Sequence, residues 1–243
     1  MGETLLFVVI TCLGVLVQSF AGFAGALCVV PLFAILLPLK EAIPAYSLVV
    51  LLINLWLVFE ARRHLRFDRL GQLLLGGCIG IPIGALALKH LPVEVLGLAV
   101  SLFTCAFAVL FLLNVRFRLS DKPRTRIGVG LASGFLGGCI AQAGPPVVFY
   151  GLARGWEKDT FRTTLLAYFT CLCAELILIY AWLGMYATRN LRTAATAAVP
   201  AFVTAFCGVA LKNRVSETLF RRMILVVVLA VGVVSLARPL WAR

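Results

Sequence analysis

The sequence predicts an all-α, polytopic membrane helical bundle, and both its composition and the lengths of its apolar segments indicate this class. Of its 243 residues, 62% are hydrophobic and 13% are charged, and the mean hydropathy is +1.05. A water-soluble domain cannot bury so much apolar surface, so lipid must surround much of the chain. Transmembrane β-strands would alternate in polarity over segments of about ten residues, and no segment here does so.

Charged residues divide the chain into eight long apolar segments. Most of these have close to the roughly 20 residues that a spanning helix needs. The sixth segment is interrupted by a single charge, Glu175. The eight segments are 4–39, 42–59, 70–88, 95–115, 127–153, 163–188, 193–211 and 223–237.

The chain also divides into two halves of similar character. We expect a first membrane repeat at 1–115, a basic connecting loop at 116–126 and a second membrane repeat at 127–243. Residues 18–33 (QSFAGFAGALCVVPLF) match residues 133–148 (SGFLGGCIAQAGPPVV) in their glycines and prolines. This similarity predicts an internal repeat.

The first and fifth segments are long and are interrupted by glycine, proline and polar residues. Such interruptions at corresponding places in two halves are typical of broken helices at the binding site of a transporter. If each of these two segments returns to the face from which it enters, one face of the membrane carries 16 basic residues and the other carries 6, whereas eight simple crossings divide them 13 to 9. The positive-inside rule therefore favours re-entrant hairpins in inverted repeats, and it places these loops in the cytoplasm: 60–69, 116–126, 154–162 and 212–222.

The glycines allow a second interpretation, in which they only let helices pack closely. For the glycine-proline clusters of the first and fifth segments this alternative stays open. For Gly76, Gly80 and Gly84, which are spaced by four in the third segment, packing is the favoured interpretation.

The two hairpin apices are the candidate binding site. Free backbone N–H groups at helix N-termini bind anions, and glycine lets an oxyanion approach the backbone closely. Neutral side chains beside the glycines add hydrogen-bond donors. The candidate substrate-binding residues are Gln18, Ser19, Gly22, Gly25, Ser133, Gly137, Gln142, Gly144, Pro145 and Arg162.

Three polar residues in the apolar segments or at their edge each have two interpretations. Arg162 either faces the cavity as an attractive cation or is one more positive-inside residue. Glu175 is a proton-coupling candidate, since burial raises a carboxyl pKa toward the physiological range, but it could instead be a structural partner. Asn54 is a weaker cavity candidate, because a hydrogen bond between helices would explain it as well.

Several other classes of protein and site are disfavoured. The basic residues lie in short patches between apolar segments, which the positive-inside bias explains without nucleic acid. The N-terminus lacks the basic region of a cleavable signal peptide. All eight cysteines lie in apolar segments with no CxxC pair, and His64 and His90 have no companions at metal-ligand spacing. We expect no metal and no cofactor.

The glycine-proline motifs also carry a family resemblance. The chain resembles the TauE/SafE (sulfite exporter) permease family in GFAGALCVVP at 22–31, the middle basic loop, and GFLGGCIAQAGPP at 134–146. The resemblance extends over nearly the whole chain. It implies transport of small sulfur-containing anions such as sulfite, sulfoacetate or other organosulfonates.

The sequence therefore predicts a multi-pass transporter of the cytoplasmic (inner) membrane, with a small anion as substrate and a proton as the candidate coupling ion. A passive anion channel is the first alternative, since the same donors could line a pore. An intramembrane enzyme is a weaker one, because no GxSG motif occurs and all three aspartates lie in loops. Neither the oligomeric state nor the direction of transport follows from the sequence.

Overall fold

A computed structural model describes residues 2–64, 70–113, 115 and 119–212 of the chain. The eighth apolar segment at 223–237 and the loop at 212–222, apart from its first residue, lie outside the described residues. Within them every regular element is a helix. The elements are α1 (Gly2–Ala21), α2 (Gly25–Leu36), α3 (Leu39–Ala61), the 3₁₀ turn η1 (Arg62–His64), α4 (Gly71–His90), α5 (Val93–Leu112), α6 (Pro123–Ile140), α7 (Gly144–Ala153), α8 (Lys158–Trp182) and α9 (Thr188–Lys212).

The predicted membrane bundle is confirmed. In the described part of the chain, six helices are long and apolar enough to cross a membrane, namely α1, α3, α4, α5, α8 and α9. Large apolar side chains such as Leu178, Trp182 and Val199 are more than two-thirds exposed on the outside of the bundle. Such a surface suits lipid, because the same side chains would face water in a soluble protein.

The first apolar segment folds into a helical hairpin. Helix α1 ends at Ala21, and the chain turns back at residues 22–24 into the short helix α2. Gly22 and Ala24 have φ angles of 78° and 72°, in the left-handed region that breaks a helix. The Phe7 and Phe33 rings stack with centroids 5.3 Å apart, so the open ends of the two helices lie together.

The fifth segment forms a second hairpin in the same way. Helix α6 ends at Ile140, Ala141 has a φ of 54°, and α7 returns from Gly144. The Ser133 hydroxyl donates to the Ala143 carbonyl at 2.5 Å and holds the turn against α6. Both long segments are therefore broken helices, as the glycine and proline interruptions predict.

Polar contacts mark two opposite ends of the bundle. At what we call the basic end, Arg126 and Arg154 both pair with Asp121. The Arg162–Glu60 ion pair also lies there, because α6 and α8 begin, and α3 and α7 end, at that end of the bundle.

At the opposite end, Arg189 pairs with Glu3 and Glu41. Lys40 donates to the Lys89 carbonyl at 3.0 Å, and the Lys89 ammonium donates to the Leu183 carbonyl at 2.9 Å. Because Glu3 begins α1 and Glu41 begins α3, the first hairpin enters and leaves by this end, whereas the second uses the basic end.

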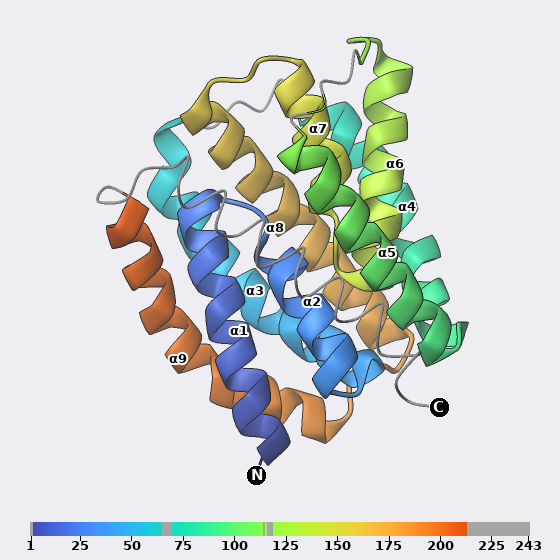
Figure 1. Ribbon diagram of the computed structural model, residues 1–243, viewed down its shortest axis with the longest axis vertical. Helices are drawn as coiled ribbons and strands as arrows, with labels where there is room; N and C mark the ends of the chain where they lie inside the picture. Colours follow the sequence, from blue (N-terminus) through green and yellow to red (C-terminus); the bar gives the residue numbers. More distant parts are fainter. Residues whose placement is uncertain (1, 65–69, 114, 116–118, 213–243) are drawn as a thin grey trace.

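The two halves pack in the same pattern. Helix α1 lies along α9 on one flank and α6 lies along α4 on the other, with α3 and α8 between them (Figure 1). Gly84 on α4 packs on the α6 backbone, and Gly208, at the matching place in the sequence, packs on the α1 backbone at Leu16. This arrangement agrees with inverted repeats, although the repeat in the sequence stays a prediction.

The packing interpretation of the third-segment glycines is confirmed. A Cβ atom on Gly76, Gly80 or Gly84 would collide with backbone carbonyls of α6. On α6, Gly134 and Gly138 would collide with carbonyls of α4 in return. Small residues on both faces let the two backbones approach closely, as in many membrane helix pairs.

The sixth apolar segment extends past the end of its helix. The segment, in which Glu175 is the single charge, runs to residue 188, but α8 ends at Trp182 and the chain turns at Gly184, whose φ is 68°. Lack of charge does not mark a helix end, because a short connection between spans can itself be apolar.

Candidate functional site

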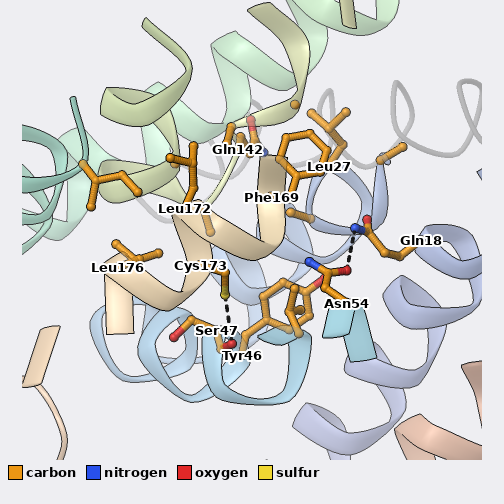
Figure 2. A pocket seen from close by; sticks show the side chains of 18 residues that line it. Gln18, Leu27, Tyr46, Ser47, Asn54, Gln142, Phe169, Leu172, Cys173 and Leu176 are labelled. Atoms are coloured by element: carbon orange, nitrogen blue, oxygen red, sulfur yellow. Dashed lines mark hydrogen bonds between the residues drawn. The ribbon is translucent and has the colours of Figure 1, made fainter. Parts of the chain in front are cut away.

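A cavity lies between the breaks of the two hairpins. It is lined by the first break and the start of α2, by the second break and the start of α7, and by one face each of α3 and α8 (Figure 2). Its volume is about 90 Å³. One water needs roughly 10–15 Å³ by this measure, so the cavity has room for several waters or one small anion. None of its 18 lining residues carries a charge.

The first hairpin brings one amide group to the cavity and α3 brings another. The Gln18 amide nitrogen donates to Asn54 Oδ1 at 3.2 Å, and Gln18 Oε1 accepts from the backbone N–H of Gly25 at 3.3 Å. Asn54 is completely buried, and its Nδ2 has no hydrogen-bond partner. Asn54 therefore fulfils both sequence interpretations, since it bonds to another helix and lines the cavity.

The second hairpin brings a third amide group. Gln142, in the break, donates from Nε2 to the Thr104 hydroxyl of α5 at 2.8 Å. Its Oε1 is buried without a partner. The cavity thus has a neutral amide from each hairpin and one from α3.

Two helix N-termini also meet at the cavity. Ala26 and Leu27, in the first turn of α2, line it, and so does Gly144 at the start of α7. First-turn N–H groups have no partner within their own helix and carry the positive end of the helix dipole. The cavity therefore has a positive electrostatic character without a basic side chain.

The predicted binding residues separate into two groups. Gln18, Gly137, Gln142 and Gly144 line the cavity. The other six do not line it, and most of them hold the hairpins in place: Ser19, Gly22, Gly25, Ser133, Pro145 and Arg162. Ser19, for example, turns its hydroxyl back to the Val15 carbonyl at 2.7 Å.

Arg162 is a clamp on the first hairpin. Its side chain is only 6% exposed; it donates to the Ser19 carbonyl at 2.9 Å and pairs with Glu60 at 3.4 Å. A Cβ atom on Gly22 would collide with Arg162 Cγ, so the glycine makes room for the arginine. Arg162 therefore acts on the position of the break, whereas the sequence analysis left open whether it faces the cavity.

A comparison with known protein families identifies the family of the chain. The family model described as "Sulfite exporter TauE/SafE" matches residues 6–235, which is nearly the whole chain. The chain belongs to the TauE/SafE sulfite exporter family. It is therefore a multi-pass membrane protein of a transporter family. No curated protein and no solved structure matches it.

In this TauE/SafE protein, Glu175 lies outside the cavity lining. It projects from α8 toward α4, where the Cys78 thiol makes a side-chain hydrogen bond with it. Its Oε2 is buried and has no partner. Leu172 and Leu176, on neighbouring turns of α8, do line the cavity, so the acid is close to the site without contributing to its wall.

Sequence reasoning missed part of the wall of this TauE/SafE cavity. Tyr46 and Ser47 from α3 and Phe169 and Cys173 from α8 line it (Figure 2). The Cys173 thiol donates to the Ser47 carbonyl at 3.2 Å and joins the two helices. A usable signal was the spacing of Ser47 and Asn54 by seven, which places both polar residues on one face of α3.

Proposed function

We propose that this TauE/SafE family member carries a small sulfur-containing anion, such as sulfite or an organosulfonate, across the cytoplasmic membrane through the cavity between its hairpins. The observation that carries the proposal is the meeting of two broken helices at one buried, uncharged cavity with amide donors. Preorganised N–H dipoles can replace the water around a single negative charge at low dielectric.

An alternating-access carrier is favoured over a passive channel. The halves have the same packing pattern and opposite hairpin directions, and such halves can rock about a central site. The two mechanisms differ in trans-stimulation, which is faster uptake when substrate is also present on the far side. A carrier shows it when exchange of substrate across the membrane is faster than net transport, and a passive channel does not.

Flux into proteoliposomes tests the proposal. Purified protein should move labelled sulfite or an organosulfonate, and unlabelled substrate on the far side should accelerate uptake. Gly144→Val should abolish the flux, because Gly144 lines the cavity and the nearest atom to a new Cβ is Phe169 Cζ at 3.8 Å, so the protein tolerates the group while the cavity loses volume. Gly97→Val is the matched control, since nothing lies within 4 Å of its Cβ position. Normal flux in the Gly144→Val variant would contradict the assigned site.

Proton coupling through Glu175 is the finer part of the proposal. An ionised carboxylate within the membrane costs several kcal/mol, about 2.5–3.5 on insertion scales for Asp. An acid that is protonated in one step of the cycle avoids that cost. Glu175→Gln should uncouple flux from the pH gradient and leave the melting temperature nearly unchanged. If Glu175 were instead a structural partner, the same substitution would lower the melting temperature.

A further inference from the structure

Two residues that line the cavity each have a buried polar atom without a hydrogen-bond partner, and the two atoms are of opposite kinds. Asn54 Nδ2 is a donor and Gln142 Oε1 is an acceptor. The two residues are 0% and 1% exposed. A buried polar atom is costly to leave unpaired, so a cavity with two of them fits a ligand that satisfies both.

In each amide the other polar atom is used in a hydrogen bond within the protein. Asn54 Oδ1 accepts from Gln18, so Nδ2 is the group left over. Gln142 Nε2 donates to Thr104, so Oε1 is the group left over. The cavity therefore has a donor from α3 beside the first hairpin and an acceptor on the second.

The backbone reinforces this polarity. Ala26 and Leu27 line the cavity from the first turn of α2, where N–H groups have no partner within the helix, while Gly25 N–H is already bonded to Gln18. In the first turn of α7, by contrast, Gly144 is followed by Pro145 and Pro146. Proline has no N–H group, so the second hairpin offers fewer donors to an anion.

We propose that the cavity selects a singly charged oxyanion that carries its own hydrogen-bond donor at the far end. The anionic oxygens would lie against Asn54 Nδ2 and the start of α2, and the ligand's hydroxyl or S–OH group would donate to Gln142 Oε1. A doubly charged ion is disfavoured, because no lining residue carries a compensating positive charge. This inference rests on the proposed function and names the substrate class within it.

Calorimetric titration of the purified protein with two matched sulfonates tests the inference. Ethanesulfonate has no donor, whereas 2-hydroxyethanesulfonate differs only by a hydroxyl. We expect the hydroxy compound to bind about tenfold more tightly, as one well-placed hydrogen bond allows. In Gln142→Met the preference should disappear, because the acceptor that distinguishes the two compounds is gone. In Asn54→Leu both affinities should fall.

Two further variants keep the test decisive. Thr164 Oγ1 is also buried without a partner but lies outside the cavity, so Thr164→Val is the control and should keep the preference. Gln142→Glu retains an acceptor and adds a negative charge, so it should weaken ethanesulfonate binding and favour the 2-amino analogue. This second readout decides the matter if Gln142→Met fails to fold.

The outcomes separate the inference from the function. Equal binding of the two sulfonates by the parent protein, or a preference that survives in Gln142→Met, would overturn the role of Gln142 and leave the transport proposal standing. If neither sulfonate nor sulfite binds or moves, the transport proposal fails and the inference falls with it.

Discussion

The two hairpins follow the same backbone route but are held in place by different chemistry. The break of the α1–α2 hairpin is clamped by a charge, the buried Arg162, which reaches it from α8. The break of the α6–α7 hairpin is held by a neutral hydroxyl, Ser133, and α6 lies backbone to backbone on α4 over residues 127–139. Similar geometry therefore does not require similar side chains, provided that each break has a bond to fix it.

The comparison also separates packing from clamping. Close backbone packing spreads its stabilisation over many small contacts, so one added methyl group disturbs the whole interface. A clamp concentrates the stabilisation in one residue, so one substitution removes it while the helices stay packed.

The largest expected effect is at the α4–α6 interface. In Gly134→Ala the new methyl group would collide with the Gly77 carbonyl, and overpacking of this kind costs about 1–3 kcal/mol or more of unfolding free energy. We expect a markedly lower melting temperature in detergent and a poor yield. Gly128→Ala is the control on the same helix, since its Cβ position has nothing within 4 Å. Equal stability of the two variants would show that the interface is looser than the glycines indicate.

The next effect is at the clamp of the first hairpin. Arg162→Gln removes the ion pair and leaves the Ser19 carbonyl without its charged donor, which we expect to cost about 1–3 kcal/mol and to slow flux by shifting the break. Ser133→Ala, at the second hairpin, should cost about 0.5–1.5 kcal/mol, the usual contribution of one neutral hydrogen bond. Thermal unfolding of both variants measures the difference. If Ser133→Ala lost more stability than Arg162→Gln, the second hairpin and not the first would depend on a single clamping residue.

The smallest effect is at the open end of the second hairpin, outside the membrane segments. Hydrogen bonds from Tyr150 and Arg126 lower the pKa of the Asp121 carboxyl. The folded state therefore binds this proton more weakly than the unfolded state does. The resulting stabilisation is present above the unfolded pKa of about 3.9 and is lost as pH falls through the folded pKa.

Melting temperatures of the parent and Asp121→Asn proteins, measured from neutral pH down to acid pH, test this linkage. The parent should be the more stable at neutral pH, and the difference should shrink below about pH 4. A difference that stays constant with pH would mean that the ionisation of Asp121 contributes nothing to stability.

The sequence predicts the hairpins better than it predicts the cavity wall. Glycines and prolines have local effects on the backbone, so both breaks could be located from residues 18–33 and 133–148. The direction in which a side chain points depends on how its helix is rotated about its own axis in the bundle. Gln18 lines the cavity while its neighbour Ser19 does not. Arg162 bonds to partners 102 and 143 residues away, and no local pattern indicates such contacts.

The lysine contacts at the end of the bundle opposite the basic end reduce the electrostatic effect of the basic residues there. Lys40 and Lys89 each donate to a carbonyl at the end of another helix, and Arg189 is paired with two glutamates. Three of the six basic residues counted on that face are thus engaged within the protein: two carboxylates offset the charge of Arg189, and each lysine lies beside the negative end of a helix dipole, which offsets its charge in part. The potential that an approaching anion meets at that end of the bundle is weaker than six positive charges would give, so the local anion concentration is enhanced less there. Such a field alters how quickly the protein captures an anion from each side; the net direction of movement depends on the gradients alone.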